Sequence, residues 1–195
     1  MAQYKEKPTR WCEAKALTFF INFIKNHNGS VNDDETFQLV ADLLTPERWY
    51  ALITKTFPSK NLQKMINAHG RNSLDFKDDP QEVLRTIWNF EFARPKLRDL
   101  LVQISTEALR KNPAEHYTHE LFPRKAAELQ RTLKLSDLEI QILLVQAFVQ
   151  KDLLCIADGH NRHSDRNDKV IFIAKSLDRD IAEIKEALTE KSRLC

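Results

Sequence analysis

The chain has 195 residues, 42% of them hydrophobic and 30% charged, which is enough for one large domain or two small ones with a buried core. Its formal net charge of +2 is too balanced to indicate a nucleic-acid-binding protein by itself. Three glycines, far apart, exclude a glycine-rich phosphate loop, a dinucleotide-binding fingerprint and a nucleophile elbow.

Cysteine usage and hydropathy predict a cytoplasmic protein. Cys12, Cys155 and Cys195 are an odd number of widely spaced thiols, as expected in a reducing compartment. Residues 1–10 are charged and lack the apolar core of a secretory signal. Apolar runs are too short to span a bilayer, so we expect no membrane segment.

The first half of the chain predicts a series of amphipathic helices. Residues 11–26 carry a broad apolar stripe at helical spacing and end at a turn around Gly29. Asn32 is the expected N-cap of the next helix, Thr45-Pro46 starts a third, and Ser59 caps a short fourth.

The middle of the chain continues this pattern after an expected loop. Asp79-Pro80-Gln81-Glu82 is a capping box, and the helix behind it should bury Trp88 and Phe92. Residues 97–111 predict another helix, which Asn112-Pro113 ends. Residues 114–122 look irregular, and Pro123 should open a helix that runs through Leu129 and Leu133.

The last 61 residues predict a helix-turn-helix-like module. A capping box at Ser136–Glu139 starts a helix that should run to about Lys151. Residues 158–168 form a very polar stretch, expected as an exposed loop. Helices over 169–177 and 180–188 complete the set, the latter with a capping box at Asp180–Glu183.

The predicted fold class is therefore all-α, a multi-helix bundle followed by a helix-turn-helix or winged-helix-like module. We expect an N-terminal helical domain at 1–112, a connecting segment and helix at 113–134, and the module at 135–195. Period-two alternation is nearly absent, and only 153–156 and 170–173 are candidates for short strands of a wing.

No catalytic constellation stands out. Cys155, His160 and His163 are chemically able to bind zinc, but they lack a fourth ligand at a typical spacing. Histidines in polar loops explain this set, and equally the pair His116 and His119, without a metal. Acidic pairs occur at expected helix N-termini, where capping accounts for them. We therefore expect no metal and no cofactor, with a metal-dependent enzyme as a remote alternative.

The helix-turn-helix-like pattern favours nucleic-acid binding, but the charges of its second helix oppose it. A recognition helix should present Arg, Lys, Asn or Gln to the major groove. The second helix of the expected pair is instead acidic, and residues 151–195 hold nine basic and nine acidic side chains. The candidate DNA contacts are Arg162, Arg166, Lys169 and Lys185.

The C-terminal third resembles a segment that precedes the ATPase core in some bacterial AAA-family ATPases. The resemblance rests on L-S-D-L-E-I-Q-I-L-L and on I-F-I-A-K-S-L-D-R-D-I-A-E-I-K-E-A-L-T-E-K-S-R-L, within residues 133–194. It implies a winged-helix-like unit in an N-terminal region. The chain has no Walker A motif, so the resemblance also implies a fragment or a stand-alone relative that does not hydrolyse ATP.

Two functional hypotheses follow. The first is a non-catalytic adaptor or regulatory region of an AAA-type ATPase, whose partner is another protein, a protein substrate or the ATPase core of the same polypeptide. The alternative is a small helix-turn-helix transcriptional regulator that binds DNA.

Overall fold

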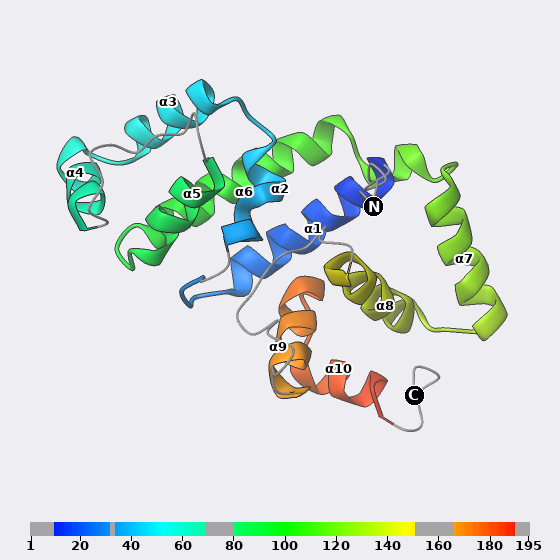
Figure 1. Ribbon diagram of the computed structural model, residues 1–195. Helices are drawn as coiled ribbons and strands as arrows, with labels where there is room; N and C mark the ends of the chain where they lie inside the picture. Colours follow the sequence, from blue (N-terminus) through cyan, green and yellow to red (C-terminus); the bar gives the residue numbers. More distant parts are fainter. Residues whose placement is uncertain (1–9, 32–33, 69–79, 151–165, 190–195) are drawn as a thin grey trace, which may run out of the picture.

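The computed structural model describes residues 10–31, 34–68, 80–150 and 166–189, and within these ranges every regular element is helical (Figure 1). The predicted all-α class is therefore confirmed for this part of the chain. The elements are α1 (Arg10–Asn26), η1 (Asp34–Phe37), α2 (Gln38–Ala41), α3 (Pro46–Thr56), α4 (Ser59–Ala68), α5 (Pro80–Asn89), α6 (Arg94–Lys111), η2 (Ala114–Tyr117), α7 (Leu121–Leu133), α8 (Asp137–Gln150), α9 (Arg166–Leu177) and α10 (Ile181–Ala187). None of the described helices has the length and apolar character needed to cross a membrane.

Helix α1 is the centre of the molecule. It packs against α6 on one side and against α9 and α8 on another (Figure 1). Ten of its seventeen residues are buried, which explains why its apolar residues surround the helix rather than forming a narrow stripe. One continuous core therefore includes side chains from the N-terminal helices and from α8, α9 and α10.

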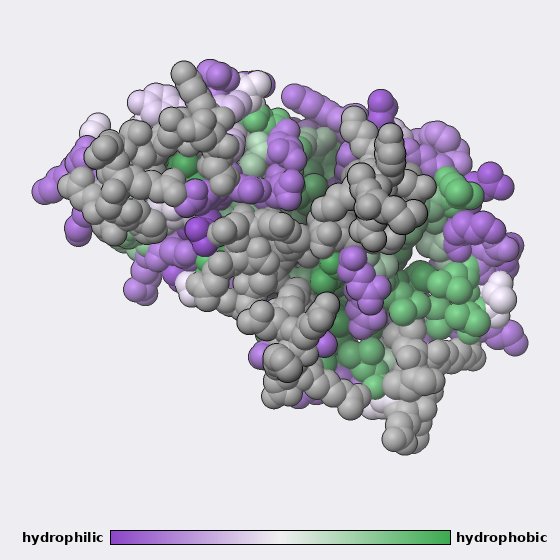
Figure 2. Space-filling model, in the orientation of Figure 1, coloured by the Kyte–Doolittle hydropathy of each residue, from purple (hydrophilic) through white to green (hydrophobic). Residues whose placement is uncertain are grey.

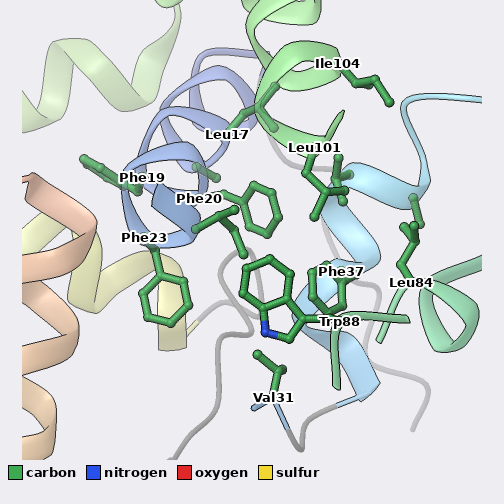
Figure 3. Packing of buried hydrophobic residues seen from close by; sticks show 14 of the residues in the cluster. Leu17, Phe19, Phe20, Phe23, Val31, Phe37, Leu84, Trp88, Leu101 and Ile104 are labelled. Carbon is green, nitrogen blue, oxygen red and sulfur yellow. The ribbon is translucent and has the colours of Figure 1, made fainter. Parts of the chain in front are cut away.

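Aromatic side chains fill the N-terminal side of this core (Figure 3). The rings of Phe20 and Phe37 meet edge to face at 6.4 Å, and Phe37 lies 5.8 Å from Trp88. Trp88 is fully buried, and its indole N–H donates to the Gly29 carbonyl at 3.0 Å. Burying a tryptophan requires such a partner for its N–H, so this bond also fixes the chain that follows α1.

Two arginines of α6 close the C-terminal end of α1. Arg98 donates to the His27 carbonyl at 2.8 Å, and Arg94 donates to the carbonyls of Asn28 and Trp88. Both guanidinium groups also lie over the Trp88 ring, at 5.8 and 6.0 Å from its centroid. Cations at a helix C-terminus satisfy free carbonyls and complement the helix dipole, so α6 is held against the end of α1.

His27 connects this region to the C-terminal helices. Its buried ring stacks on Phe23 at 4.7 Å and lies nearly parallel to Trp88 at 6.4 Å. Its Nδ1 is 3.4 Å from Nζ of Lys175 in α9. Helices α1, α5 and α9 therefore meet at one imidazole.

Capping at Ser136 is as predicted. The Ser136 hydroxyl accepts from the Glu139 N–H at 3.2 Å, and the Glu139 carboxylate accepts from the Ser136 N–H at 2.7 Å. This reciprocal pair is the capping box and it starts α8. At α10, the Asp180 carboxylate accepts from the Ala182 N–H at 2.7 Å, which confirms Asp180 as an N-cap.

Several local predictions were wrong. Residues 170–173 lie inside α9 rather than in a strand, because Val170, Ile173 and Ala174 form one buried helical face. Phe92 is 47% exposed and lies beyond the end of α5. The continuous helix expected after Asn32 is a 3-10 turn followed by the single turn of α2. Thr45 occupies the N-cap position of α3, but its side chain makes no capping bond.

The structure does not bear on the predicted wing. No strand occurs in the described ranges, and the other strand candidate, 153–156, lies outside them. Helix α8 packs against α9, and α9 packs against α10; a three-residue turn joins α9 and α10. The proposed boundaries at 112 and 135 stay predictions.

Candidate functional site

The predicted DNA-contacting residues are only partly within the described chain. Lys169 in α9 and Lys185 in α10 are exposed. Arg166 is the first residue of α9, and Arg162 lies outside the described residues. The exposed surface of α10 also carries Glu183, whose carboxylate lies 3.9 Å from Arg179. The exposed Lys185 on α10 therefore has an acidic neighbour in Glu183, and the predicted set of DNA contacts stays a prediction.

The zinc candidates Cys155, His160 and His163 lie outside the described residues. His116 is in η2, His119 follows it, and both are exposed. Across the residues that the structure describes, no three His, Cys, Asp or Glu side chains are grouped so that they could hold a metal ion. Cys12 is buried in α1, as expected for a small core residue.

Helix α7 has a different kind of surface. Its 13 residues include one buried side chain, Pro123. The described part of the chain has seven large exposed hydrophobic side chains, and four of them come from this helix: Leu121, Phe122, Leu129 and Leu133, with exposed fractions of 70, 36, 43 and 48%. A helix with so many exposed large apolar residues marks a surface that other molecules can cover.

The N-terminal end of α7 is fixed to α1. Glu120 accepts a hydrogen bond from the Trp11 N–H at 3.1 Å, so the carboxylate stabilises the positive end of α1. The Phe122 ring lies 5.7 Å from Trp11 and 6.0 Å from Phe148 of α8. These contacts hold the first turn of α7 in place.

The C-terminal end of α7 is fixed to α8. Lys134 adopts a left-handed conformation with φ of 52°, and the Leu135 N–H donates back to the Gln130 carbonyl at 2.9 Å. This is the Schellman arrangement that ends helices. The Gln130 amide then donates to Asp137 of α8 at 2.8 Å. Helix α7 is therefore positioned at both ends.

The apolar side chains of α7 lie along one face. Phe122, Ala126, Leu129 and Leu133 are spaced three and four residues apart, and we call this set the α7 stripe. At about 1.5 Å per residue, the stripe is about 16 Å long. A stripe of this kind normally packs into a core, but here Leu129 and Leu133 are nearly half exposed.

Helix α8 is the neighbour of this stripe. It is apolar on most sides, and Leu138, Leu143 and Leu144 are only partly buried. In the space-filling view, apolar side chains gather over the region of α7 and α8 (Figure 2). The two helices therefore contribute neighbouring apolar surface, of which the α7 stripe is the most exposed part.

The polar surface of α7 is basic. Residues 120–134 hold four basic and two acidic side chains, and Arg124, Lys125, Arg131 and Lys134 are all exposed. Lys125 donates to the Glu128 carboxylate at 2.9 Å. That hydrogen bond and the charge of Lys125, followed by the charges of Arg131 and Arg124, lower the pKa of Glu128 below its ordinary value. At about 100° per residue, Arg124 and Arg131 lie on the side of α7 opposite the apolar stripe, whereas Lys125 lies beside it.

Comparison with known proteins adds no relative: no family model, no curated protein and no solved structure matches the chain. The resemblance of residues 133–194 to the AAA-family segment therefore stays a prediction.

Sequence reasoning found the helix at Leu129 and Leu133 but missed the surface that it forms. The spacing of the apolar residues was visible in the sequence, and it predicts an amphipathic helix. Periodicity identifies an apolar face, but it does not tell whether another element covers that face. The sequence therefore carries no signal that this apolar face stays open.

Proposed function

We propose that this chain is a non-catalytic adaptor or regulatory region of an AAA-type ATPase and that it binds a protein partner through α7. The observation that carries the binding role is the exposed α7 stripe on a helix that is fixed at both ends. A preorganised apolar surface loses little conformational freedom on binding. The link to an ATPase rests on the resemblance of residues 133–194.

The mechanism requires no chemistry from the chain itself. The apolar side chains of α7 would be removed from water by the partner, which is the main favourable term in protein association. Contacts of α7 with α1 and α8 would then connect the bound partner to the rest of the helical core. Partner binding could in this way be coupled to an ATPase core held elsewhere on the same assembly.

The test uses full-length AAA-type ATPases from the organism that encodes this chain. We expect at least one of them to bind the chain in a titration, with a change in its ATP turnover, while the chain alone hydrolyses no ATP. Binding should weaken about tenfold or more in Leu129→Asp, because an interface anchor is removed. The adaptor proposal is overturned if none of these ATPases binds or responds.

One observation favours DNA binding as a second candidate. The turn between α9 and α10 is short, with Asp178 in a left-handed conformation at φ of 53°, as suits two helices joined by a tight turn. Lys169 and Lys185 are exposed on these helices. The acidic surface of α10 opposes docking on phosphates.

A gel-shift titration on duplex DNA at low and high salt tests this candidate. Salt-dependent binding that weakens in Arg162→Ala, Arg166→Ala, Lys169→Ala and Lys185→Ala variants is the expected result for a DNA-binding protein. Lack of any shift at low salt removes the candidate.

A further inference from the structure

A buried histidine lies at the junction of α1, α5 and α9. His27 directly follows α1 and is 6% exposed. Its ring stacks on Phe23 at 4.7 Å, faces Trp88 of α5 at 6.4 Å and meets Lys175 of α9. Histidine is the side chain that ordinarily changes its charge between about pH 5 and 8. The charge at this junction can therefore depend on pH.

The partners of the two ring nitrogens define the protonation state of His27. Its Nε2 lies 3.2 Å from the carbonyl oxygen of Ser30, which only accepts, so Nε2 carries a hydrogen. Its Nδ1 lies 3.4 Å from Nζ of Lys175, whose ammonium only donates, so Nδ1 presents its lone pair. Both contacts are satisfied together by the neutral imidazole with its hydrogen on Nε2. A second proton on Nδ1 would point an N–H group at an ammonium.

The cations around His27 oppose this second proton. Lys175 brings one positive charge directly to the ring. From α6, Arg98 donates to the His27 carbonyl at 2.8 Å, and Arg94 binds the next carbonyl along the chain. Lys25, on the last turn of α1, is exposed and adds a screened charge. Like charges at close range in a buried site repel strongly, so protonation of the ring is disfavoured.

Two features favour a charged ring, and both are weaker. Aromatic faces attract cations, but the Trp88 ring already has two guanidinium groups near it. The carboxylate of Asp178, beyond the end of α9, accepts from the Asn26 amide at 3.0 Å in an exposed position, where solvent screens its charge. Burial itself also penalises the charged form of the imidazole.

We propose that His27 is a proton-controlled contact between α1 and α9: the neutral ring accepts a hydrogen bond from Lys175, and protonation of Nδ1 turns this contact into repulsion and releases Lys175 toward solvent. Lys175 is half-buried, and its long side chain can reach water without a change in the helix. The link between α9 and the end of α1 is therefore complete when His27 is neutral and broken when it is charged. This device does not depend on what binds at α7.

The direction of the pH effect follows from the same contact. In the unfolded chain His27 gains its proton near about pH 6.5, as an ordinary histidine does. The folded chain resists this proton, so the unfolded state binds more protons and the free energy of unfolding falls as the pH is lowered. The stabilising contribution of neutral His27 is therefore present above about pH 7 and is lost toward about pH 5.

NMR of the full chain with isotopically labelled histidine tests the ring directly, from about pH 8 to about pH 5. We expect hydrogen on Nε2 at the upper end of this range. In Lys175→Met, which removes the ammonium and keeps an apolar stem, His27 should gain its second proton at a higher pH than in the native chain. Hydrogen on Nδ1 of the neutral ring, or protonation at the same pH in both chains, overturns the proposal.

A second readout follows Lys175 itself. Nuclear Overhauser contacts between its side chain and the His27 ring should be present at about pH 7.5 and lost once the ring is protonated. General loosening of the protein would weaken the contacts of His27 with Phe23 as well, whereas release of Lys175 alone leaves them in place. A contact with Lys175 that persists in the protonated state contradicts its release.

Stability measurements then test whether the contact matters to the fold. The urea midpoint of the native chain should fall more between about pH 7.5 and 5.5 than that of His27→Gln, whose amide can form hydrogen bonds but gains no proton in this range. The matched control is His116→Gln, which removes an exposed imidazole and should keep the native response. Equal responses of His27→Gln and the native chain overturn the proposal. If His27→Gln does not fold, Lys175→Met replaces it in this comparison, and its response to pH should also be smaller than the native one.

Discussion

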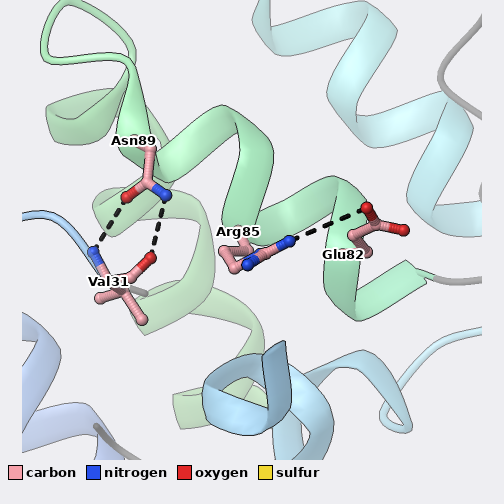
Figure 4. Close-up of polar contacts among 4 residues, drawn as sticks. All are labelled: Val31, Glu82, Arg85 and Asn89. Atoms are coloured by element: carbon pink, nitrogen blue, oxygen red, sulfur yellow. Dashed lines mark hydrogen bonds and ion pairs between the residues drawn. The ribbon is translucent and has the colours of Figure 1, made fainter. Parts of the chain in front are cut away.

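At the scale of single residues, one asparagine shows how a side chain replaces regular backbone pairing. The Asn89 amide accepts from the Val31 N–H and donates to the Val31 carbonyl, both at 2.9 Å (Figure 4). Val31 is 1% exposed and follows α1 without any helix to satisfy its backbone groups. Buried peptide groups need partners, so Asn89 at the end of α5 anchors this connection. The ion pair of Arg85 with Glu82 nearby, at 3.8 Å, adds little because both side chains remain partly exposed to solvent.

Replacing Asn89 with alanine should lower the free energy of unfolding by about 1–2 kcal/mol, because two hydrogen bonds to Val31 are lost. Asn89→Asp should also destabilise, since it keeps the acceptor but turns an oxygen instead of an N–H toward the Val31 carbonyl. Urea unfolding measures both. The exposed Gln146 of α8 provides the control, and Gln146→Ala should stay within about 0.5 kcal/mol of the native chain. An Asn89→Ala variant as stable as the control contradicts the anchoring role.

At the scale of elements, helix ends explain most of what the sequence predicted correctly. Ser136 and Asp180 were identified from capping patterns, and both accept backbone N–H groups in the structure. The predicted helices through Leu133 and over 169–177 also end where α7 and α9 end, but the left-handed turns that follow them were not predicted. Lys134 and Asp178 adopt the left-handed conformation that glycine favours. Because neither residue is a glycine, the sequence does not signal these two turns. The exposed stripe of α7 depends on one such turn, because Lys134 sets the direction of α8.

The turn at Lys134 gives a stability prediction. A side chain with a Cβ atom is disfavoured at φ of 52°, so Lys134→Gly should raise the free energy of unfolding by about 0.5–1 kcal/mol. Lys134→Ala is the matched control, because it removes the ammonium group and keeps the Cβ atom. Urea unfolding of the two variants separates the backbone effect from the loss of charge. Equal stability of the glycine and alanine variants means that the turn carries no such strain.

At the scale of the whole molecule, composition and periodicity were sufficient for the fold class but not for the arrangement of the helices. The apolar residues of α1 predicted a buried helix, and they did not identify its neighbours. Its packing on both α6 and α9 depends on contacts between residues more than 70 positions apart, such as Arg98 with His27 and Lys175 with His27. Pattern reasoning along the chain does not specify such pairs, since many helix pairings satisfy the same stripes. For the same reason it did not show that α7 would keep an open face.

The shared position of α1 leads to a prediction about cooperativity. Phe148 in α8 is 1% exposed and contacts Trp11 and Phe19 of α1, whereas Phe37 in η1 is fully buried against Phe20 of α1 and Trp88. Phe148→Ala and Phe37→Ala should each cost about 3–5 kcal/mol, as expected for buried phenylalanines. If the helices form one cooperative unit, either substitution lowers the hydrogen-exchange protection of α6 and α9 by the same free energy.

A different exchange pattern is expected if the two predicted domains unfold independently. If residues 1–112 fold independently of residues 135–195, Phe37→Ala exposes the amides of α6 to exchange and leaves those of α9 protected. Phe148→Ala then has the reverse effect. We expect the cooperative result, because α1 buries side chains against both groups of helices and neither group retains a complete core without it. A protein partner bound at α7 would then stabilise the amides of α6 as well as those of α8, and the same exchange experiment in the presence of that partner measures the coupling.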